Sequence, residues 1–358
     1  MDGYEDYFGL DGELSSLNRE RQRRSERRDE NAHAAKRNNR RRKRTLPNSR
    51  VFTAAAVAVV YVIATVMMFA FSKDLGVRIK ENEEETVAEN VLDNPVYPDD
   101  YETVQLNRSE INNGFLLLIN NEYACTHDGI DLANLSENYN KTYQLTDYSV
   151  EANNTTIEHM NLMFSDFKKA VGENDLMISC AYRSMALQEQ LYKEEIEEKG
   201  VEEGSKWVTK AGHSEHQSGY AFDLTLRDKN GIITEFDGEG KYAWIKEHCE
   251  NYGFIIRYPS DKTELTGIYH EPWHIRYVGV AHACYIKEHN ICLEEYISEL
   301  KSYSVQKPLE YQDCHMNRWC IYYVAAQDGV TDVPVPKGKE YEISGNNVDG
   351  FIVSVKMN

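Results

Sequence analysis

The residues with the clearest chemical potential lie in two short segments of the chain. One segment reads Gly-His-Ser-Glu-His-Gln-Ser-Gly-Tyr-Ala-Phe-Asp and ends at Asp223, and the other reads Glu-Pro-Trp-His and ends at His274. His216, Asp223 and His274 are the ligand types of a catalytic zinc, which takes three protein ligands and keeps a fourth position for water. Glu271 is then free to accept a proton from that water. These residue types predict a hydrolytic zinc site.

Further candidates surround this predicted centre. Arg183 follows an expected strand, and its fixed cation suits a substrate carbonyl, oxyanion or carboxylate. Ser214 lies two residues before His216 and could hydrogen-bond to a substrate, and Trp273 is also predicted to bind substrate. His213 is a rival to His216 as the metal ligand, because spacing alone does not choose between them.

Separate helices and strands are expected to position these residues. Residues 220–225 alternate large and small side chains, which predicts a strand with Asp223 on the same face as Ala221. Pro272 keeps Glu271 out of a helix, so His274 is expected to open a strand. Other segments predict helices over residues 157–171, 185–199, 241–252 and 278–300, and strands over residues 115–119 and 176–180. Regular βαβ alternation is missing from this order, so we expect an α+β fold.

The first 110 residues differ in character from the rest of the chain. Residues 1–50 are polar and rich in arginine, although the 358-residue chain has a net charge of −19, and we expect disorder there. Residues 51–72 carry no charge, and as a helix they would span roughly 33 Å, enough to cross a membrane core of about 30 Å. The basic cluster on one side predicts a single-pass membrane protein with a cytoplasmic N-terminus. Residues 73–110 are expected to form an extracellular stalk.

The remaining chain is predicted to hold two parts. Residues 111–300 carry the site, and residues 301–358 are expected to form a small β-rich appendage with strands over 321–325, 341–344 and 351–355. All seven cysteines follow the uncharged span, where an oxidising exterior would permit disulfides. Spacing singles out Cys314 and Cys320 as a local bridge, and two buried free thiols are the alternative.

One family shares this pattern of residues. The motif Ser214-x-His216-x-x-Gly219-x-Ala221-x-Asp223, followed by Glu271-x-Trp273-His274, resembles the signature of the VanY-type D-alanyl-D-alanine carboxypeptidases. These zinc peptidases are related to the lysostaphin-type peptidases and the hedgehog fold. The resemblance covers residues 115–300 and implies an antiparallel sheet with flanking helices.

The resemblance also implies a role for single residues. It places zinc on His216, Asp223 and His274, and makes Glu271 the catalytic base. Arg183 would stabilise the substrate carbonyl, and Gln188 occupies a position where the family has a glutamine near the substrate. The family has Ser-Gly-Tyr before this arginine, whereas here the residues are Cys180-Ala181-Tyr182.

These expectations combine into one predicted function. The family acts on peptidoglycan stem peptides, so we expect a membrane-anchored zinc D,D-carboxypeptidase that removes a terminal D-alanine outside the cell. The motif does not specify the residue before the cleaved bond, so an L,D-carboxypeptidase or an endopeptidase is an alternative. A non-catalytic zinc-binding module of the cell wall is another alternative, although a structural site needs no free base such as Glu271. Nucleic-acid binding is not expected, because the membrane span already accounts for the arginines.

Overall fold

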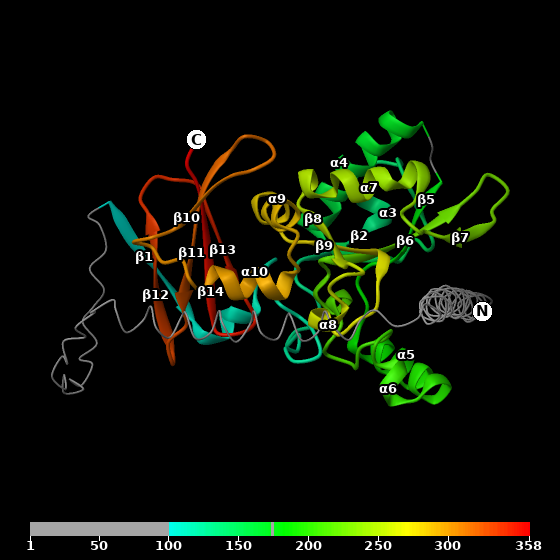
Figure 1. Ribbon diagram of the computed structural model, residues 1–358, viewed down its shortest axis with the longest axis horizontal. Helices are drawn as coiled ribbons and strands as arrows, with labels where there is room; N and C mark the ends of the chain where they lie inside the picture. Colours follow the sequence, from blue (N-terminus) through cyan, green and yellow to red (C-terminus); the bar gives the residue numbers. More distant parts are fainter. Residues whose placement is uncertain (1–99, 173–174) are drawn as a thin grey trace, which may run out of the picture. The chain divides into compact units, whose positions relative to one another are not determined.

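The computed structural model describes residues 100–172 and 175–358, which belong to one compact unit (Figure 1). The predictions for residues 1–50 and 51–72, and most of the predicted stalk, therefore lie outside the described residues. Within the described part of the chain, no helix combines the length and the apolar character that a membrane span requires.

A six-stranded mixed sheet carries Asp223, Glu271, Trp273 and His274. Its strand order is β3-β5-β6-β9-β8, with β7 paired to β6. Only the short pair β3 and β5 is parallel, and the other pairs are antiparallel. The strands are β3 (Gln144–Leu145), β5 (Leu176–Cys180), β6 (Ala221–Arg227), β7 (Ile233–Glu235), β8 (Phe254–Tyr258) and β9 (Glu271–Tyr277). The predicted α+β class is confirmed, and the sheet is mixed rather than wholly antiparallel.

Side-chain alternation separates the apolar core from the polar site. Phe222 of β6 and Ile275 of β9 are fully buried in the same hydrophobic cluster as Phe164 of helix α4. Helices α4 and α7 lie on one side of the sheet, and α5 and α6 lie on the other (Figure 1). Because neighbouring residues in a strand point to opposite faces, Asp223 and His274 project away from this core.

Two predicted helices are confirmed together with their end signals. Helix α4 (Asn154–Val171) begins after Asn153, whose side chain accepts a hydrogen bond from the Thr155 backbone, and it ends at Gly172 in the left-handed conformation. Helix α5 (Met185–Lys199) begins after Ser184, which caps it in the same way. Shorter helices are α3 (Leu135–Asn138), α6 (Val201–Gly204) and α8 (Thr263–Thr266).

Two other predicted helices are interrupted. The segment predicted over residues 241–252 consists of α7 (Ala243–His248) between the 3₁₀ turns η3 (Gly240–Tyr242) and η4 (Cys249–Tyr252). The segment predicted over residues 278–300 divides into α9 (Val280–His289) and α10 (Leu293–Leu300). Asn290 separates these two helices because its φ of 51° is left-handed, which ends an α-helix.

The strand prediction for residues 115–119 is wrong. These residues are not in a sheet, and the carbonyl oxygens of Phe115 and Leu117 accept hydrogen bonds from the buried Arg276 guanidinium instead. His274 also differs from its prediction, since β9 begins at Glu271 and His274 lies in the middle of the strand. For residues 115–119, the contacts of the Phe115 and Leu117 carbonyl oxygens are made by Arg276, a side chain far away in sequence.

The strands predicted within residues 301–358 are present. Strands β11 (Arg318–Ala325), β13 (Tyr341–Gly345) and β14 (Gly350–Lys356) match the predicted ones and join β10 (Leu309–Gln312) in the order β10-β11-β14-β13. A separate pair contains β12 (Val330–Pro336) and β1 (Tyr101–Asn107). Strand β1 comes from the end of the predicted stalk, so the chain from Tyr101 onward is part of the folded unit. A third small sheet pairs β2 (Leu132–Asn134) with β4 (Glu151–Asn153).

The structure pairs Cys314 with Cys284, so the predicted Cys314–Cys320 bridge is wrong. Cys284 lies on α9, and its Cα atom is 5.9 Å from that of Cys314. Cys320 is free and lies inside β11, where its cross-strand neighbours are Glu310 and Val355. Sequence spacing favoured the nearer cysteine, whereas the position of α9 brings the more distant one within bonding range.

His282 joins the appendage to the rest of the unit. It lies on α9 and is 1% exposed. Its Nδ1 is 2.6 Å from the Tyr296 hydroxyl on α10, and its Nε2 is 2.9 Å from Ser354 Oγ on β14. Burial lowers the pKa of His282 to about 3, so the folded protein holds this imidazole neutral.

We expect His282 to make the protein less stable in mild acid. Below the ordinary histidine pKa of about 6.5, His282 is protonated in the unfolded chain and stays neutral in the folded chain. The free energy of unfolding therefore falls by about 2 kcal/mol between pH 6.5 and pH 5. Urea unfolding at several pH values should show that His282→Gln removes this component, and that His289→Gln, an exposed position on the same helix, does not. Equal pH dependence in both variants would contradict the assignment.

Candidate metal and catalytic site

The three predicted metal ligands meet on the sheet face opposite the apolar core. Asp223 of β6 and His274 of β9 are direct cross-strand partners. His216 comes from η2 (Glu215–Ser218), which ends at Gly219, a left-handed residue just before β6. His216 Nε2 is 3.3 Å from Asp223 Oδ2, and His274 Nδ1 is 3.0 Å from Asp223 Oδ1. One carboxylate therefore lies between two imidazoles.

Hydrogen bonds on the far side of each ring orient the two imidazoles. His216 donates from Nδ1 to the Ala181 carbonyl oxygen at 2.7 Å, which leaves its Nε2 lone pair facing Asp223. His274 donates from Nε2 to Glu215 Oε2 at 3.3 Å, which leaves its Nδ1 facing Asp223. Metal-binding histidines in proteins are commonly fixed by such outer hydrogen bonds to a carbonyl or a carboxylate. Burial would raise the pKa of Asp223, but the two histidines hold it well below its usual value.

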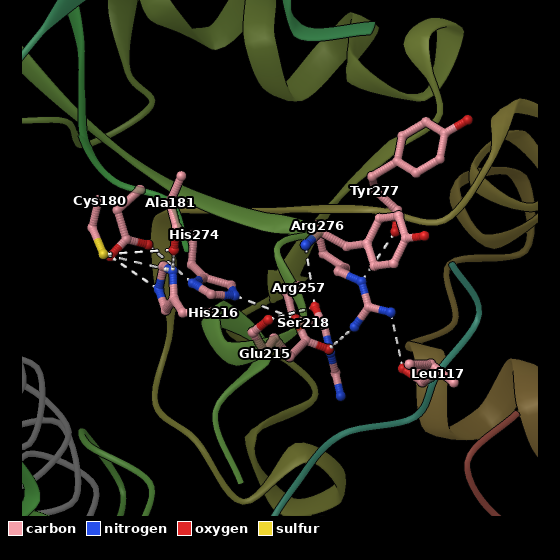
Figure 2. A network of polar contacts seen from close by, with 12 residues as sticks. Leu117, Cys180, Ala181, Glu215, His216, Ser218, Arg257, His274, Arg276 and Tyr277 are labelled. Atoms are coloured by element: carbon pink, nitrogen blue, oxygen red, sulfur yellow. Dashed lines mark hydrogen bonds and ion pairs between the residues drawn. The ribbon is translucent and has the colours of Figure 1, made fainter. Parts of the chain in front are cut away.

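Glu215, which sequence reasoning did not single out, belongs to a buried ionic network. Its Oε1 accepts hydrogen bonds from Arg257 Nε at 2.8 Å and from Arg276 Nη1 at 2.6 Å. The side chains of all three are 0% exposed. Burial would raise the pKa of Glu215, but the charges of Arg276 and Arg257 outweigh it and hold this pKa well below its usual value. His274 therefore links the metal ligands to the network (Figure 2).

Glu271, the predicted base, is the first residue of β9 and is 8% exposed. Burial raises its pKa to about 7, and the nearby Asp223 carboxylate acts in the same direction while His274 opposes it. A carboxylate with a raised pKa is a stronger base than an exposed one, so this environment suits proton transfer near neutral pH.

Arg183 lies beside the ligand group. Its Nη2 is 3.9 Å from Asp223 Oδ2, and its Nη1 donates to Gln188 Oε1 at 2.9 Å. Gln188 is 1% exposed, and its amide nitrogen donates to the Thr209 carbonyl oxygen at 2.6 Å. Both polar ends of Gln188 are engaged within the protein, and its contact with Arg183 orients the guanidinium. Its predicted contact with substrate stays a prediction.

The other predicted site residues have different surroundings. Ser214 is 7% exposed and immediately precedes η2. Trp273 is partly buried and packs against the apolar core cluster. Its predicted contact with substrate stays a prediction. His213, the rival ligand, donates from Nδ1 to the Asn120 carbonyl oxygen at 2.6 Å instead of joining the ligand group.

Cys180 is a further member of the site that the sequence did not reveal. A register shift between Ile178 and Cys180 makes Cys180 the cross-strand partner of Asp223. Ala181 replaces the glycine of the family pattern, and it is not among the residues with a positive φ, so alanine fits there without strain.

Two imidazoles, a carboxylate and a buried glutamate with a raised pKa are the parts of a hydrolytic metal centre. Comparisons with known proteins agree with this class. The VanY family model, described as D-alanyl-D-alanine carboxypeptidase, matches residues 149–280. A D-alanyl-D-alanine carboxypeptidase from Enterococcus faecium is 35% identical over 254 residues, which cover 70% of this chain and 78% of that protein. The chain belongs to the VanY family and is a metallopeptidase of the D-alanyl-D-alanine carboxypeptidase type.

Two further relatives extend the comparison. A protein from Enterococcus gallinarum, the bifunctional D-Ala-D-Ala dipeptidase and D-Ala-D-Ala carboxypeptidase VanXYC, is 39% identical over 127 residues, covering 35% of this chain and 67% of that protein. The crystal structure of the D,D-dipeptidase VanXYg, in complex with a D-Ala-D-Ala phosphinate analog, has a TM-score of 0.65 and 32% identity. This match covers 72% of this chain and 99% of that one.

Proposed function

We propose that the protein is a zinc D,D-carboxypeptidase that removes the terminal D-alanine from peptidoglycan stem peptides. The main support for this proposal is the convergence of His216 and His274 on Asp223. The buried Glu271 lies on the same strand as His274. Membership of the VanY family and the activity named for the Enterococcus faecium relative support the choice of substrate.

The donor set fits zinc. Nitrogen and carboxylate oxygen ligands in a two-to-one ratio occur in catalytic zinc sites, where the ion is Lewis acidic and lowers the pKa of a coordinated water to about 7. His216 Nε2, an Asp223 carboxylate oxygen and His274 Nδ1 would hold the ion, because the opposite ring nitrogens are committed to Ala181 and Glu215.

The chain's own residues supply the remaining steps. The Glu271 carboxylate accepts a proton from the attacking water and delivers it to the amine of the leaving D-alanine. The Arg183 guanidinium, oriented by Gln188, stabilises negative charge that develops on the scissile carbonyl oxygen. Burial of both groups strengthens these interactions because less water screens them.

Mass analysis of products from three substrates tests the proposal. We expect the full-length protein to release one D-alanine from a pentapeptide stem ending in D-Ala-D-Ala and to leave the tetrapeptide stem intact. Shortening of the tetrapeptide instead would support an L,D-carboxypeptidase, and cleavage of a cross-linked pair of stems, supplied in a separate reaction, would support an endopeptidase. The free dipeptide D-Ala-D-Ala is the third substrate, because two of the relatives are named as dipeptidases. Cleavage of none of these would contradict the proposed function.

Removal of metal tests the cofactor separately. We expect a strong chelator to abolish turnover and zinc to restore it, since attack on an amide at neutral pH depends on an activated water. Full activity in protein shown by elemental analysis to be free of metal would rule out the zinc mechanism.

We also propose that residues 51–72 anchor the protein in the cell membrane with the catalytic domain outside. The absence of charge over this span and the arginine-rich residues before it support this topology. Deletion of residues 1–49 is expected to leave both membrane association and hydrolysis intact, whereas deletion of residues 1–72 should release active protein. Cell fractionation distinguishes these results, and release by the shorter deletion would count against the anchor.

A further inference from the structure

The segment of residues 115–125 lies between the C-terminal appendage and the metal site. Its leucines at positions 116–118 are at most 5% exposed, and residues 115–119 belong to no sheet. Buried backbone N–H and C=O groups outside helices and sheets need other hydrogen-bond partners, because an unpaired one costs free energy. Here the partners come from two sides. One side is the turn between β13 and β14, and the other is the surroundings of the metal ligands.

Two peptide groups of this segment join the turn to Arg276. The peptide group 115–116 accepts a hydrogen bond from Arg276 Nη2 at 2.9 Å and donates one to Ser344 Oγ at 2.9 Å. The peptide group 117–118 accepts from Arg276 Nη2 at 2.9 Å and donates to the Asn346 carbonyl oxygen at 3.1 Å (Figure 2 shows Arg276 beside Leu117). A peptide group is planar and rigid, so a shift at one of its hydrogen bonds displaces the other.

A third peptide group joins the same turn to the chain that carries a metal ligand. The carbonyl oxygen of Ala124 accepts a hydrogen bond from Asn347 Nδ2 at 3.0 Å. The N–H of the same peptide group, which belongs to Cys125, donates to the Gly212 carbonyl oxygen at 2.7 Å. Gly212 lies four residues before His216. The turn between β13 and β14 therefore contacts both approaches to the metal site through single peptide groups.

Asn347 makes most of the side-chain contacts of this turn. It is 7% exposed, and its Nδ2 uses both hydrogens, on the carbonyl oxygens of Leu118 at 2.9 Å and Ala124 at 3.0 Å. Its backbone N–H donates to the Ile111 carbonyl oxygen at 2.8 Å. Its φ of 61° is left-handed, a conformation that asparagine adopts more readily than most other residues. Asparagine thus suits both the backbone of the turn and the two carbonyl oxygens.

The contacts of Arg276 continue to the metal ligand His274. Arg276 Nη1 donates to Glu215 Oε1 at 2.6 Å, and Glu215 Oε2 accepts from His274 Nε2 at 3.3 Å. The carbonyl oxygens at positions 115 and 117 hold the other arm of the guanidinium, so they fix the direction from which it meets Glu215. Partners behind a metal-binding histidine commonly set its orientation and the metal affinity.

We propose that the C-terminal appendage, residues 301–358, is part of the support of the metal centre, and that Asn347 is its main positioning residue. This inference rests on the metal centre proposed above. The turn between β13 and β14 fixes the 115–125 segment, and that segment fixes Arg276 and the chain before His216. The site residues between positions 111 and 300 therefore depend on the appendage to hold zinc in the geometry that hydrolysis needs.

Asn347→Asp in the full-length protein tests the inference. Aspartate has the same size and also accepts a left-handed φ, but it places a carboxylate oxygen against the carbonyl oxygens of Leu118 and Ala124. We expect chelator competition, without denaturant, to show zinc affinity about 3- to 30-fold lower, the usual range for residues that act on a site through others. In the cobalt(II)-substituted protein, the visible d–d absorption should also change, because it depends on the arrangement of the ligands.

The matched control is Asn317→Asp. Asn317 also belongs to the appendage, and its amide nitrogen donates to Asp313 Oδ2 at 3.0 Å within the turn that follows β10. The same chemical change therefore weakens the appendage at a different place. We expect urea unfolding to show lower stability in both variants, while zinc affinity and the cobalt spectrum change only in Asn347→Asp.

Ser344→Ala is a milder second variant, which removes the acceptor of the Leu116 N–H and decides the question if Asn347→Asp does not fold. We expect a smaller loss of zinc affinity in the same direction. Wild-type affinity and an unchanged cobalt spectrum in the folded variants of the turn would refute the positioning role. An equal loss in Asn317→Asp would refute it too, because the appendage would then act only through overall stability. Failure of the wild-type protein to bind zinc would refute the metal centre and this inference together.

Discussion

Replacing Glu271 with glutamine is expected to lower kcat by about 10²- to 10⁴-fold, the usual contribution of a general base. The amide keeps the size of the side chain and cannot take the proton of the attacking water. Glu271 is not one of the proposed ligands, so zinc content should remain at the wild-type level. Steady-state kinetics on the pentapeptide stem, combined with elemental analysis, measures both quantities.

The matched control for Glu271 is Glu264→Gln. Glu264 is an exposed residue of α8 and lies close to Glu271 in sequence, so the change removes the same charge outside the site. We expect its kcat to stay within about twofold of wild type, since surface changes rarely disturb a distant site. If Glu271→Gln retained full turnover, another group would have to be the base. Loss of zinc in that variant would show instead that Glu271 supports the metal.

Replacing Glu215 with glutamine is expected to weaken both the fold and the metal site. The change removes the anion between Arg257 and Arg276, whose side chains are 0% exposed, and disrupting a buried ion pair costs about 3–5 kcal/mol. It also weakens the acceptor that fixes the His274 ring, and loss of such an outer partner typically reduces metal affinity about 10- to 100-fold. Urea unfolding and chelator competition measure the two effects.

Glu294→Gln separates these two effects. Glu294 accepts hydrogen bonds from Arg257 Nη1 and Nη2 at 2.9 and 2.6 Å. It therefore belongs to the same ionic network, while Glu215 is the member that contacts His274. We expect Glu294→Gln to lower the free energy of unfolding and to leave zinc affinity unchanged. An equal loss of zinc affinity in both variants would mean that the network acts only through overall stability.

Short-range patterns allowed several elements of this fold to be predicted. The apolar spacing and the glycine after residue 171 predicted α4, and a similar glycine predicted the end of α5. Helix ends and strand alternation depend on neighbouring residues, so they are visible in sequence. Elements governed by distant partners were not predictable. Strand β1 pairs with β12 more than 200 positions away, and residues 115–119 lie against Arg276 rather than in a sheet.

The sequence by itself determined the α+β class, the family and the residue types from which a metal centre can be built. His216, Asp223, His274 and Glu271 were selected because zinc hydrolysis needs those chemical groups, and strand alternation already placed Asp223 on the same face as Ala221 and opposite to Phe222.

The tertiary structure alone decided which groups surround these residues. It placed Glu215 behind His274, turned Cys180 toward Asp223, excluded His213 from the ligand group and packed Trp273 against the apolar core. Each outcome depends on strand register, on a bulge or on a partner far away in sequence. A one-residue change in register reverses the direction of every side chain in a strand, so these contacts cannot be predicted from the amino-acid sequence of one protein.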